Sequence, residues 1–366
     1  MITQTTPLTL PYPPSLPEGV KPEEALFFDI ETTGFAADVT ALYLIGCVCQ
    51  KDGVWTLLQW FADDNRSEAS LLTSFFRLAE DYSCLLHYNG TSFDLPYLMK
   101  KCEKHSFDYH IPEEKSYDLY KKLQPFRSLL RLEHLKQRNL ESYLGLVRPS
   151  PYSGGDLISY YGLYLKAKYG HLPEEASYQE LLLSHNREDL IGLLGITPLL
   201  ALPAMLDSCT AQPAVRSLEK KELLIPLLLP MPVPKPLYWR MESLSLSASD
   251  CQATLRVSLC QQELKFFYSN YKDYYYLPEE DMAIHKSIAF YVDKHYRTRA
   301  KAANCYSKHT GCFIPQFEEL LEPFFKIDYA DRTTWLEATD EFCQDTEQLT
   351  RYARHLLRHL VIHHRK

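Results

Sequence analysis

The sequence has little that would place the protein in or across a membrane. Its longest apolar run of membrane character, residues 223–233, is about half the length of a spanning helix and contains three prolines. No basic segment precedes an apolar stretch near residue 1, so we expect no signal peptide. We therefore expect a cytoplasmic protein with no membrane partner.

The chain also lacks internal repeats and low-complexity tracts, and its composition is that of a folded protein. Hydrophobic residues make up 46% of the 366 residues and charged residues 23%, close to globular averages, which excludes a disordered or fibrous protein. This length favours about two domains. The ten cysteines are scattered, several of them within apolar runs, which is typical of buried thiols in a reducing compartment.

The negative charge is confined to the first half of the chain. The net charge is −8; residues 22–205 contain 17 Lys and Arg against 25 Asp and Glu, and the remainder is neutral. This balance disfavours a simple polyanion binder. An acidic domain can nevertheless act on nucleic acid if its carboxylates hold divalent cations, because the ions then dominate the local field.

Prolines indicate where the domains begin and end. Five prolines in residues 1–21 predict a Pro-rich N-terminal tail, and six in residues 207–236 predict a Pro-rich linker, because Pro interrupts helices and central strands. Residues 22–206 are expected to form one domain. Residues 237–366 are expected to form a smaller α+β C-terminal domain of unknown role.

The pattern of apolar residues in the first domain predicts an α/β fold. The period-2 and continuous apolar runs predict a mixed five-stranded sheet flanked by helices. The expected strands are residues 25–30, 41–50, 54–62, 83–89 and 116–120. The expected helices are residues 68–82, 93–105, 132–144, 156–168 and 178–194.

Two carboxylates lie at the end of the first expected strand of this domain. Asp29 and Glu31 follow the apolar run Leu26-Phe27-Phe28 at positions i and i+2, so both side chains project from one face. Adjacent buried carboxylates repel one another unless cations neutralise them. The pair alone is weak evidence for a site, because such triplets are common by chance.

Further acids follow in two later segments. Asp94 stands between a predicted strand and a helix with Pro96 in its first turn, where a helix N-cap is the simplest interpretation. His185 and Asp189 are four residues apart on one face of a predicted helix, a pair that also occurs on ordinary solvated helices.

Taken together, these three segments resemble the DEDD exonuclease superfamily of the ribonuclease H-like fold, and within it the bacterial YprB-like proteins. The resemblance covers about residues 22–205 and rests on Asp29, Glu31, Asp94, His185 and Asp189. It implies that the four acids bind two divalent cations, Mg²⁺ or Mn²⁺, which favour oxygen ligands. Three residues separate His185 from Asp189, the spacing of the sister group that carries Tyr instead of His.

The resemblance also implies roles for the histidine and for nearby polar residues. His185 would accept a proton from the attacking water, or alternatively orient Asp189 or simply pack. Thr32, Thr33 and Asn89 are candidate substrate-binding residues, although turn stabilisation explains each of them equally well. An excess of basic residues over residues 115–148 could follow the substrate backbone or be a solvated helix face.

The C-terminal half contains a dense group of aromatic residues near a basic segment. Residues 264–268 and 274–277 are expected to form an aromatic hairpin, and residues 294–308 carry five Lys and Arg with no acid. This combination suits single-stranded nucleic acid, although aromatic residues in strands are mostly core.

The sequence therefore predicts a two-metal-ion-dependent 3′-to-5′ exonuclease, a phosphodiester hydrolase. DNA is favoured over RNA as its nucleic acid partner, with a role in DNA repair or nucleic-acid processing. The alternatives are a ribonuclease of the same fold and a catalytically inactive nucleic-acid-binding tether. A helicase would suit such a nuclease as a protein partner, although no segment encodes a contact with one.

Overall fold

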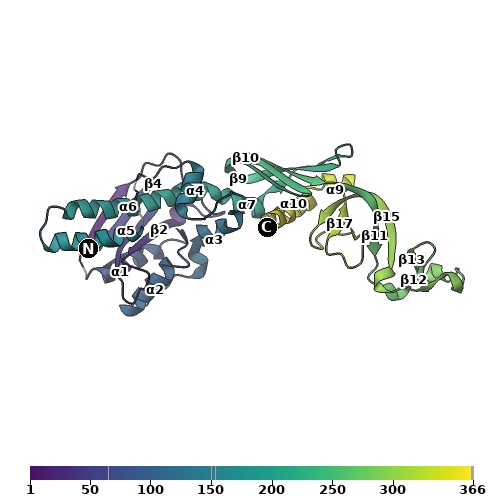
Figure 1. Cartoon of the computed structure of the whole chain (residues 1–366), viewed down its shortest axis with the longest axis horizontal. Coiled ribbons are helices and arrows are strands. Elements are labelled where there is room, and N and C mark those ends of the chain that lie inside the picture. Colours follow the sequence, from purple (N-terminus) through teal and green to yellow (C-terminus); the bar gives the residue numbers. More distant parts are fainter. Residues whose placement is uncertain (65, 150, 153, 364–366) are drawn as a thin grey trace. The chain divides into compact units, whose positions relative to one another are not determined.

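The computed structural model describes residues 1–64, 66–149, 151–152 and 154–363 (Figure 1). Within it the chain divides into two compact units, Met1–Ala204 and Met205–Lys366. Each unit is described separately below.

The first unit is built on a mixed sheet of six strands, one more than the five expected. Its strand order is β1-β4-β3-β2-β5-β6, with β2 antiparallel to β3 and parallel to β5. The strands are β1 (Ile2–Pro7), β2 (Ala25–Thr32), β3 (Leu42–Lys51), β4 (Val54–Phe61), β5 (Cys84–His87) and β6 (Ser116–Asp118).

The additional strand, β1, corrects the prediction of an N-terminal tail. Ile2–Pro7 pairs antiparallel with β4 and forms one edge of the sheet. Its residues alternate between half-buried and exposed, and four of the five prolines come after it. An edge strand needs little apolar character, and the threonines of this segment have high strand propensity, so a hydrophobic pattern does not reveal it.

Helices cover both faces of the sheet. Those of the first unit are α1 (Glu68–Glu80), α2 (Asp94–Lys104), α3 (Leu119–Leu123), α4 (Gln137–Leu144), α5 (Gly154–Tyr169) and α6 (Glu175–Ile196), and α7 (Ala201–Ser208) follows. Phe28 of β2 packs on Phe75 of α1, whereas the next residue, Asp29, bonds to Asn186 of α6. Because successive strand residues face opposite sides, α1 and α6 lie on opposite faces.

Helix α6 approaches the sheet closely because β3 has a glycine opposite Asp29. A Cβ atom on Gly46 would lie 2.0 Å from the side-chain oxygen of Asn186. Gly46 also pairs with Asp29 across the β2–β3 ladder. The missing side chain therefore allows a polar helix face to reach the strand that carries the first acids.

The same helix corrects one expectation about apolar segments. The helical stretch Glu175–Ser208 is long and apolar enough to cross a membrane by length and composition, whereas the sequence interpretation considered only residues 223–233. In the structure, 61% of its most apolar window is buried inside the protein. Helix α6 packs on β2, β3 and β4, the arrangement of a core helix.

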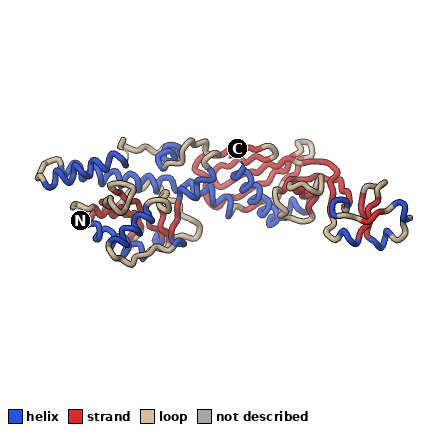
Figure 2. Tube along the Cα trace, turned by 60° about the horizontal axis from the view of Figure 1, so that its bottom comes forward, coloured by secondary structure: helices blue, strands red, loops and turns tan. Residues whose placement is uncertain are grey.

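The second unit contains three sheets and one long helix (Figure 2). One sheet holds β7 (Thr210–Ala211), β8 (Val215–Ser217), β9 (Glu222–Met241) and β10 (Leu244–Ser258). The next holds β11 (Cys260–Phe267), β15 (Tyr306–Gln316), β16 (Phe324–Phe325) and β17 (Thr334–Glu337). The smallest holds β12 (Tyr274–Leu277), β13 (Met282–His285) and β14 (Thr298–Arg299). The helices are α8 (Lys286–Ala289), α9 (Asp340–Gln344) and α10 (Thr346–His363).

The predicted Pro-rich linker over residues 207–236 is wrong. Strand β9 runs from Glu222 to Met241 and pairs with β7, β8 and β10, so a boundary at residue 237 would cut through it. Four of its prolines lie at 230–236, where Val233 is the one residue paired with β10. Pro226 lies within the regular ladder, and its carbonyl accepts a hydrogen bond from Gln212. The four prolines at 230–236 therefore lie where the strand makes few ladder hydrogen bonds, so their missing amide donors cost little.

The expected aromatic hairpin also does not form. Strand β11 pairs with β15, and β12 pairs with β13 and β14, so the two aromatic segments belong to different sheets. Tyr268 and Tyr274 still stack, with ring centroids 4.4 Å apart, and pack against a small core. The partner of β11 lies about 40 residues later in the chain, where no short-range turn signal could indicate it, whereas β12 pairs with β13 across the four residues 278–281.

Candidate active site

Strand β2 places two carboxylates on the face that α6 covers. Asp29 is half-buried and Glu31 is buried, and they pair with Gly46 and Leu44 of β3. The ladder becomes irregular immediately after Glu31. The two acids therefore lie at the end of a buried strand, side by side as their i, i+2 spacing indicates.

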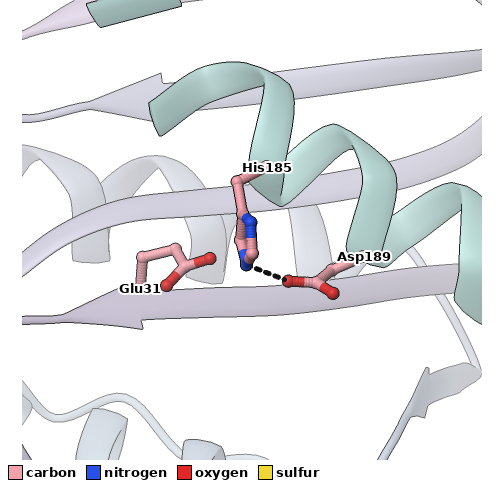
Figure 3. Close-up of side chains that lie close together, drawn as sticks. All are labelled: Glu31, His185 and Asp189. Atoms are coloured by element: carbon pink, nitrogen blue, oxygen red, sulfur yellow. Dashed lines mark ion pairs between the residues drawn. The ribbon is translucent and has the colours of Figure 1, made fainter. Parts of the chain in front are cut away.

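Helix α6 brings a histidine and a third acid to Glu31. Figure 3 shows Glu31 projecting from its strand toward His185 and Asp189, which come from one face of the helix. A carboxylate oxygen of Glu31, a ring nitrogen of His185 and a carboxylate oxygen of Asp189 all lie within 4.8 Å of one another. The Nε2 atom of His185 is 3.2 Å from Oδ2 of Asp189. Segments separated by more than 150 residues in the sequence thus meet.

Asp94 is the fourth acid and is the first residue of α2. The N-cap position is held by Phe93, so the capping interpretation of Asp94 does not describe its place in the helix. The side chain is buried, and burial raises its pKa to about 7, while hydrogen bonds from the backbone amides of Asp94 and Ile30 act in the opposite direction. The contact with Ile30 ties the start of α2 to β2.

The acids on β2 are strongly disfavoured in their charged form. The pKa of Asp29 is raised well above its ordinary value by burial and by the charges of Asp189, Glu31 and Asp94. Burial and the charges of Asp189 and Asp94 also raise the pKa of Glu31. All four carboxylates therefore interact electrostatically, and added positive charge would stabilise their ionised forms.

Asp189 differs from the other acids because two basic groups contact it. Burial alone would raise its pKa, but the hydrogen bond with His185 and the charge of Arg148 lower it below the ordinary value. Arg148 donates to Oδ1 of Asp189, while His185 contacts Oδ2. Both oxygens of this carboxylate thus have partners.

Arg148 was not predicted as a site residue; the sequence placed it only in a basic segment. Its Nη2 and Nε atoms lie 2.7 Å and 3.1 Å from the two carboxylate oxygens of Glu141. The side-chain amide of Gln137 donates to Glu141 (2.9 Å) and to the backbone carbonyl of Asp189 (2.8 Å). These bonds fix α4 against α6. They also engage the guanidinium group of Arg148, so this residue is not available to contact a substrate backbone.

Asn186 and Gln59 were also missed. Asn186 donates from Nδ2 to Oδ2 of Asp29 at 3.0 Å, and its Oδ1 accepts from Gln59 at 2.9 Å. Gln59 also donates to the carbonyl of Leu183 at 2.9 Å. A detectable signal existed for Gln59, which lies within an apolar strand, because buried amides are normally hydrogen-bonded. Asn186 lies in a charged segment and gave no such signal.

One buried ring nitrogen near the acids, Nδ1 of His185, has no partner among the described residues. The hydroxyl of Tyr43 interacts with Glu31 by a side-chain hydrogen bond. Burial and the charges of Glu31 and Asp29 raise the pKa of Tyr43 well above its ordinary value, which keeps its proton in place. The site therefore retains one ring nitrogen for a hydrogen bond to water or substrate.

The predicted substrate-binding threonines take part in a turn. The hydroxyl of Thr32 donates to the carbonyl of Gly34 (2.9 Å), and the hydroxyl of Thr33 accepts from the backbone amide of Ala41 (2.8 Å). These bonds support the alternative of turn stabilisation. A contact of either residue with nucleic acid stays a prediction.

Asn89 lies in the loop that leads to Asp94. It has a φ of 61°, a left-handed conformation that Asn tolerates, and its backbone amide donates to Asp118 at 2.9 Å. Asp118 also accepts from the amides of Thr91 and Tyr120, and Nδ1 of His87 accepts from the amide of Gly90. Asp118 and His87 thus shape this loop, and a substrate contact by Asn89 stays a prediction.

The residues present fit hard divalent cations. Carboxylate oxygens are the ligands that Mg²⁺ and Mn²⁺ prefer, and the pKa values of Asp29, Glu31 and Asp94 are raised by burial and by neighbouring carboxylates. One departure concerns Asp189, whose oxygens contact Arg148 and His185. Each oxygen of Asp189 keeps a second lone pair for a cation, but the positive charge of Arg148 opposes cation binding there.

Comparisons with known proteins gave one family match and several distant structural matches. A family model described as the RNase_H superfamily matches residues 26–200. No curated protein matches the chain. Among solved structures, a family B DNA polymerase from Pyrobaculum calidifontis is 13% identical, with a TM-score of 0.38, and the match covers 68% of this chain and 35% of the polymerase.

The exonuclease I structures are similarly distant. Exonuclease I in its apo form is 12% identical, with a TM-score of 0.28 and coverage of 55% of each chain. E. coli exonuclease I in complex with a dA16 oligonucleotide is 13% identical, with a TM-score of 0.26, covering 62% of this chain and 54% of that enzyme. The chain thus matches between a third and just over half of these proteins' length. The family match and the mixed six-stranded sheet together show that residues 26–200 have the ribonuclease H-like α/β fold.

Proposed function

We propose that the first unit is a nuclease that hydrolyses phosphodiester bonds with two divalent cations. One observation carries the proposal: carboxylates from β2, the start of α2 and α6 converge although burial and mutual repulsion disfavour their ionised forms. A fold gains nothing in stability from such a cluster, so its retention is best explained by cations that it binds. The acids that would hold these cations are Asp29, Glu31, Asp94 and Asp189.

The chemistry divides between the cations and the chain. When bound, two such cations activate a water molecule and stabilise the leaving oxygen of a phosphodiester. His185 would accept the proton of the attacking water. Its contact with Asp189 favours a proton on Nε2, which leaves Nδ1 as the accepting atom, and Nδ1 has no partner among the described residues.

The contact with Asp189 also supports the other role of His185, which is to orient that carboxylate. The variant His185→Ala separates the two roles. If His185 is the proton acceptor, the rate of cleavage falls strongly while Mn²⁺ affinity is mostly kept. If it orients Asp189, both fall together.

The finer parts of the proposal come from the family resemblance. They are exonucleolytic cleavage in the 3′-to-5′ direction, DNA in preference to RNA, a role in DNA repair or nucleic-acid processing and a helicase partner. A cytoplasmic location is proposed separately, from the sequence pattern. The ten cysteines are free thiols, as a reducing compartment would maintain them.

The test uses end-labelled single- and double-stranded DNA and RNA with Mg²⁺, Mn²⁺ or EDTA. Asp29→Asn is compared with Asp52→Asn, an exposed aspartate in the turn between β3 and β4 whose φ of 48° also suits Asn. Metal-dependent shortening of the labelled strand, lost in Asp29→Asn and kept in Asp52→Asn, is expected. Cleavage that is indifferent to Asp29 or to metal would disprove the proposal.

The same assay distinguishes the alternatives. Faster shortening of RNA than of DNA would assign a ribonuclease with the same chemistry. Binding without cleavage under all metal conditions would assign the inactive tether.

A further inference from the structure

The second unit contains a large cavity with an excess of positive charge. It measures about 1310 Å³ and lies between one face of α10, strand β7 and the segment from Phe317 to Thr333. Four arginines and two glutamates line it: Arg332, Arg351, Arg354, Arg358, Glu318 and Glu347. None of these residues belongs to the carboxylate site.

Two of the arginines have evident structural roles. Arg354 donates from Nε and Nη2 to the carbonyl of Cys209 at 3.0 Å and 2.8 Å, and Arg358 lies 3.2 Å from Asp207. These bonds hold α10 to the chain around β7. They leave the charge of Arg354 without an acidic partner among the described residues.

The other two arginines have no such role. Arg332 and Arg351 are exposed and have no ion-pair partner among the described residues, yet they come from different elements and line the same cavity. Water screens these exposed charges, so they cost the fold little and remain available to bind an anion. The helix dipole does not account for Arg351, which lies in the second turn of α10, far from the C-terminal end where cations are stabilised.

Two histidines of the cavity, His355 and His359, contribute little charge at neutral pH. The pKa of His359 falls to about 4 because of burial and the neighbouring His363 and His355. His355 accepts a hydrogen bond from the backbone amide of Phe317, which requires an unprotonated Nε2. The charge of the arginines therefore does not depend on a proton of either of these two histidines.

The cavity also offers ring surfaces beside these charges. Phe317 stacks on His359 with ring centroids 3.4 Å apart, and His359 lies 4.1 Å from His363. Stacked rings next to guanidinium groups suit the bases and phosphates of a nucleic acid strand. The volume exceeds the range of about 300–1000 Å³ usual for small-molecule pockets, and Arg351, Arg354 and Arg358 form a row along α10. Both features favour a ligand with several phosphates in series.

We propose that this cavity binds single-stranded nucleic acid, with Arg332 and Arg351 contacting its phosphates and the Phe317–His359 stack contacting a base. Only the choice of nucleic acid among polyphosphate ligands rests on the proposed function. The binding itself needs no cation in the carboxylate site.

The test measures fluorescence anisotropy of a labelled oligothymidylate with the full chain in excess EDTA, where metal-dependent cleavage cannot occur. Arg332→Ala and Arg351→Ala, singly and combined, are compared with Arg240→Ala, an exposed arginine of β9 outside the cavity. The combined variant should bind about tenfold more weakly, and each single change should reduce the slope of log affinity against log salt by about 0.7. Arg240→Ala should match the wild type. Circular dichroism confirms that every variant is folded.

An affinity of the combined variant within about twofold of the wild type would overturn the proposal. So would full displacement of the strand by inorganic tripolyphosphate at equal phosphate concentration, which would assign a small phosphorylated ligand. Failure here and failure of the nuclease proposal are separable. Loss of binding in the arginine variants without any metal-dependent cleavage would leave a binding protein, and cleavage that needs Asp29 with unchanged binding would leave a nuclease whose cavity serves another purpose.

Discussion

The first unit encloses acidic side chains in its candidate site, whereas the second has exposed arginines that line an open cavity. Glu31 and Asp94 are buried and Asp29 is half-buried, so water screens their repulsion only in part, and burial together with neighbouring acids raises their pKa values. Arg332 and Arg351 are exposed, so water screens them and their convergence costs little. An enclosed cluster of carboxylates is stabilised by tightly bound cations. An exposed cluster of arginines suits an anionic ligand that binds and dissociates readily. The difference in solvent screening thus favours bound cations in the first unit and a reversibly bound polyanion in the second.

The largest difference is expected in catalysis. Glu31→Gln should reduce the rate of cleavage at least about 100-fold, since it removes a charged ligand at the reacting centre. The matched control is Glu103→Gln, an exposed glutamate of α2. Single-turnover measurement of labelled-strand shortening checks this, and a loss below about tenfold would remove Glu31 from the site.

Stability should separate a buried arginine from an exposed one. The side chain of Arg148 is only 10% exposed and that of its partner Glu141 only 5%. Arg148→Ala should lower the free energy of unfolding by about 3 kcal/mol because it leaves Glu141 buried without its ion pair. Arg351→Ala should change it by less than about 0.5 kcal/mol.

Urea denaturation checks the comparison. A second substitution, Glu141→Gln, should recover part of the stability of Arg148→Ala, because no unpaired charge then remains buried. Equal effects of Arg148→Ala and Arg351→Ala would show that the network around Asp189 is not formed.

Divalent cations should stabilise the first unit and leave the second unchanged. Mn²⁺ at about 100 times its dissociation constant should add about 2.7 kcal/mol to the free energy of unfolding. Asp29→Asn should reduce this gain, and Arg332→Ala should keep it. Thermal unfolding with and without Mn²⁺ provides the measurement, and an identical gain in Asp29→Asn would place the ions elsewhere.

The smallest expected effect is a pH dependence in the absence of metal. Asp94 has a pKa raised from 3.8 to about 7 in the folded state, and those of Asp29 and Glu31 rise as well, so the folded state binds more protons than the unfolded state in this range. The contribution of these three acids to stability should therefore fall as pH increases from about 4 through about 7.

Asp94→Asn should flatten this dependence, since its side chain does not titrate. Denaturation midpoints across the pH range in EDTA give the measurement. A difference in stability between the wild type and Asp94→Asn that stays constant over the same range would contradict the raised pKa of Asp94.

Local patterns predicted much of the first unit. The strands around residues 25–30, 41–50 and 54–62 and the helices around residues 68–82 and 178–194 lie close to β2, β3, β4, α1 and α6, because apolar periodicity reports directly on burial. Strand β1 was missed because an edge strand buries little. Strand β9 was missed because its prolines suggest an interrupted strand. In the structure, four of them lie where the ladder with β10 is itself interrupted.

Part of the candidate site was also predictable from short local motifs. Asp29, Glu31, Asp94, His185 and Asp189 belong to short motifs whose order the resemblance to a known family could interpret. Arg148, Asn186 and Gln59 belong to no motif. Their roles come from partners that are between 41 and 157 residues away along the chain.

The order of amino acids by itself determined which segments are strands or helices in the first unit and which residues carry acid, base and amide groups. Tertiary structure alone decided how close those groups come, that α6 approaches β2 over Gly46, and that Arg148 neutralises Asp189 rather than facing solvent. The physical reason is that backbone preference acts over a few residues, whereas repulsion, hydrogen bonding and burial depend on distances that only the packed chain sets.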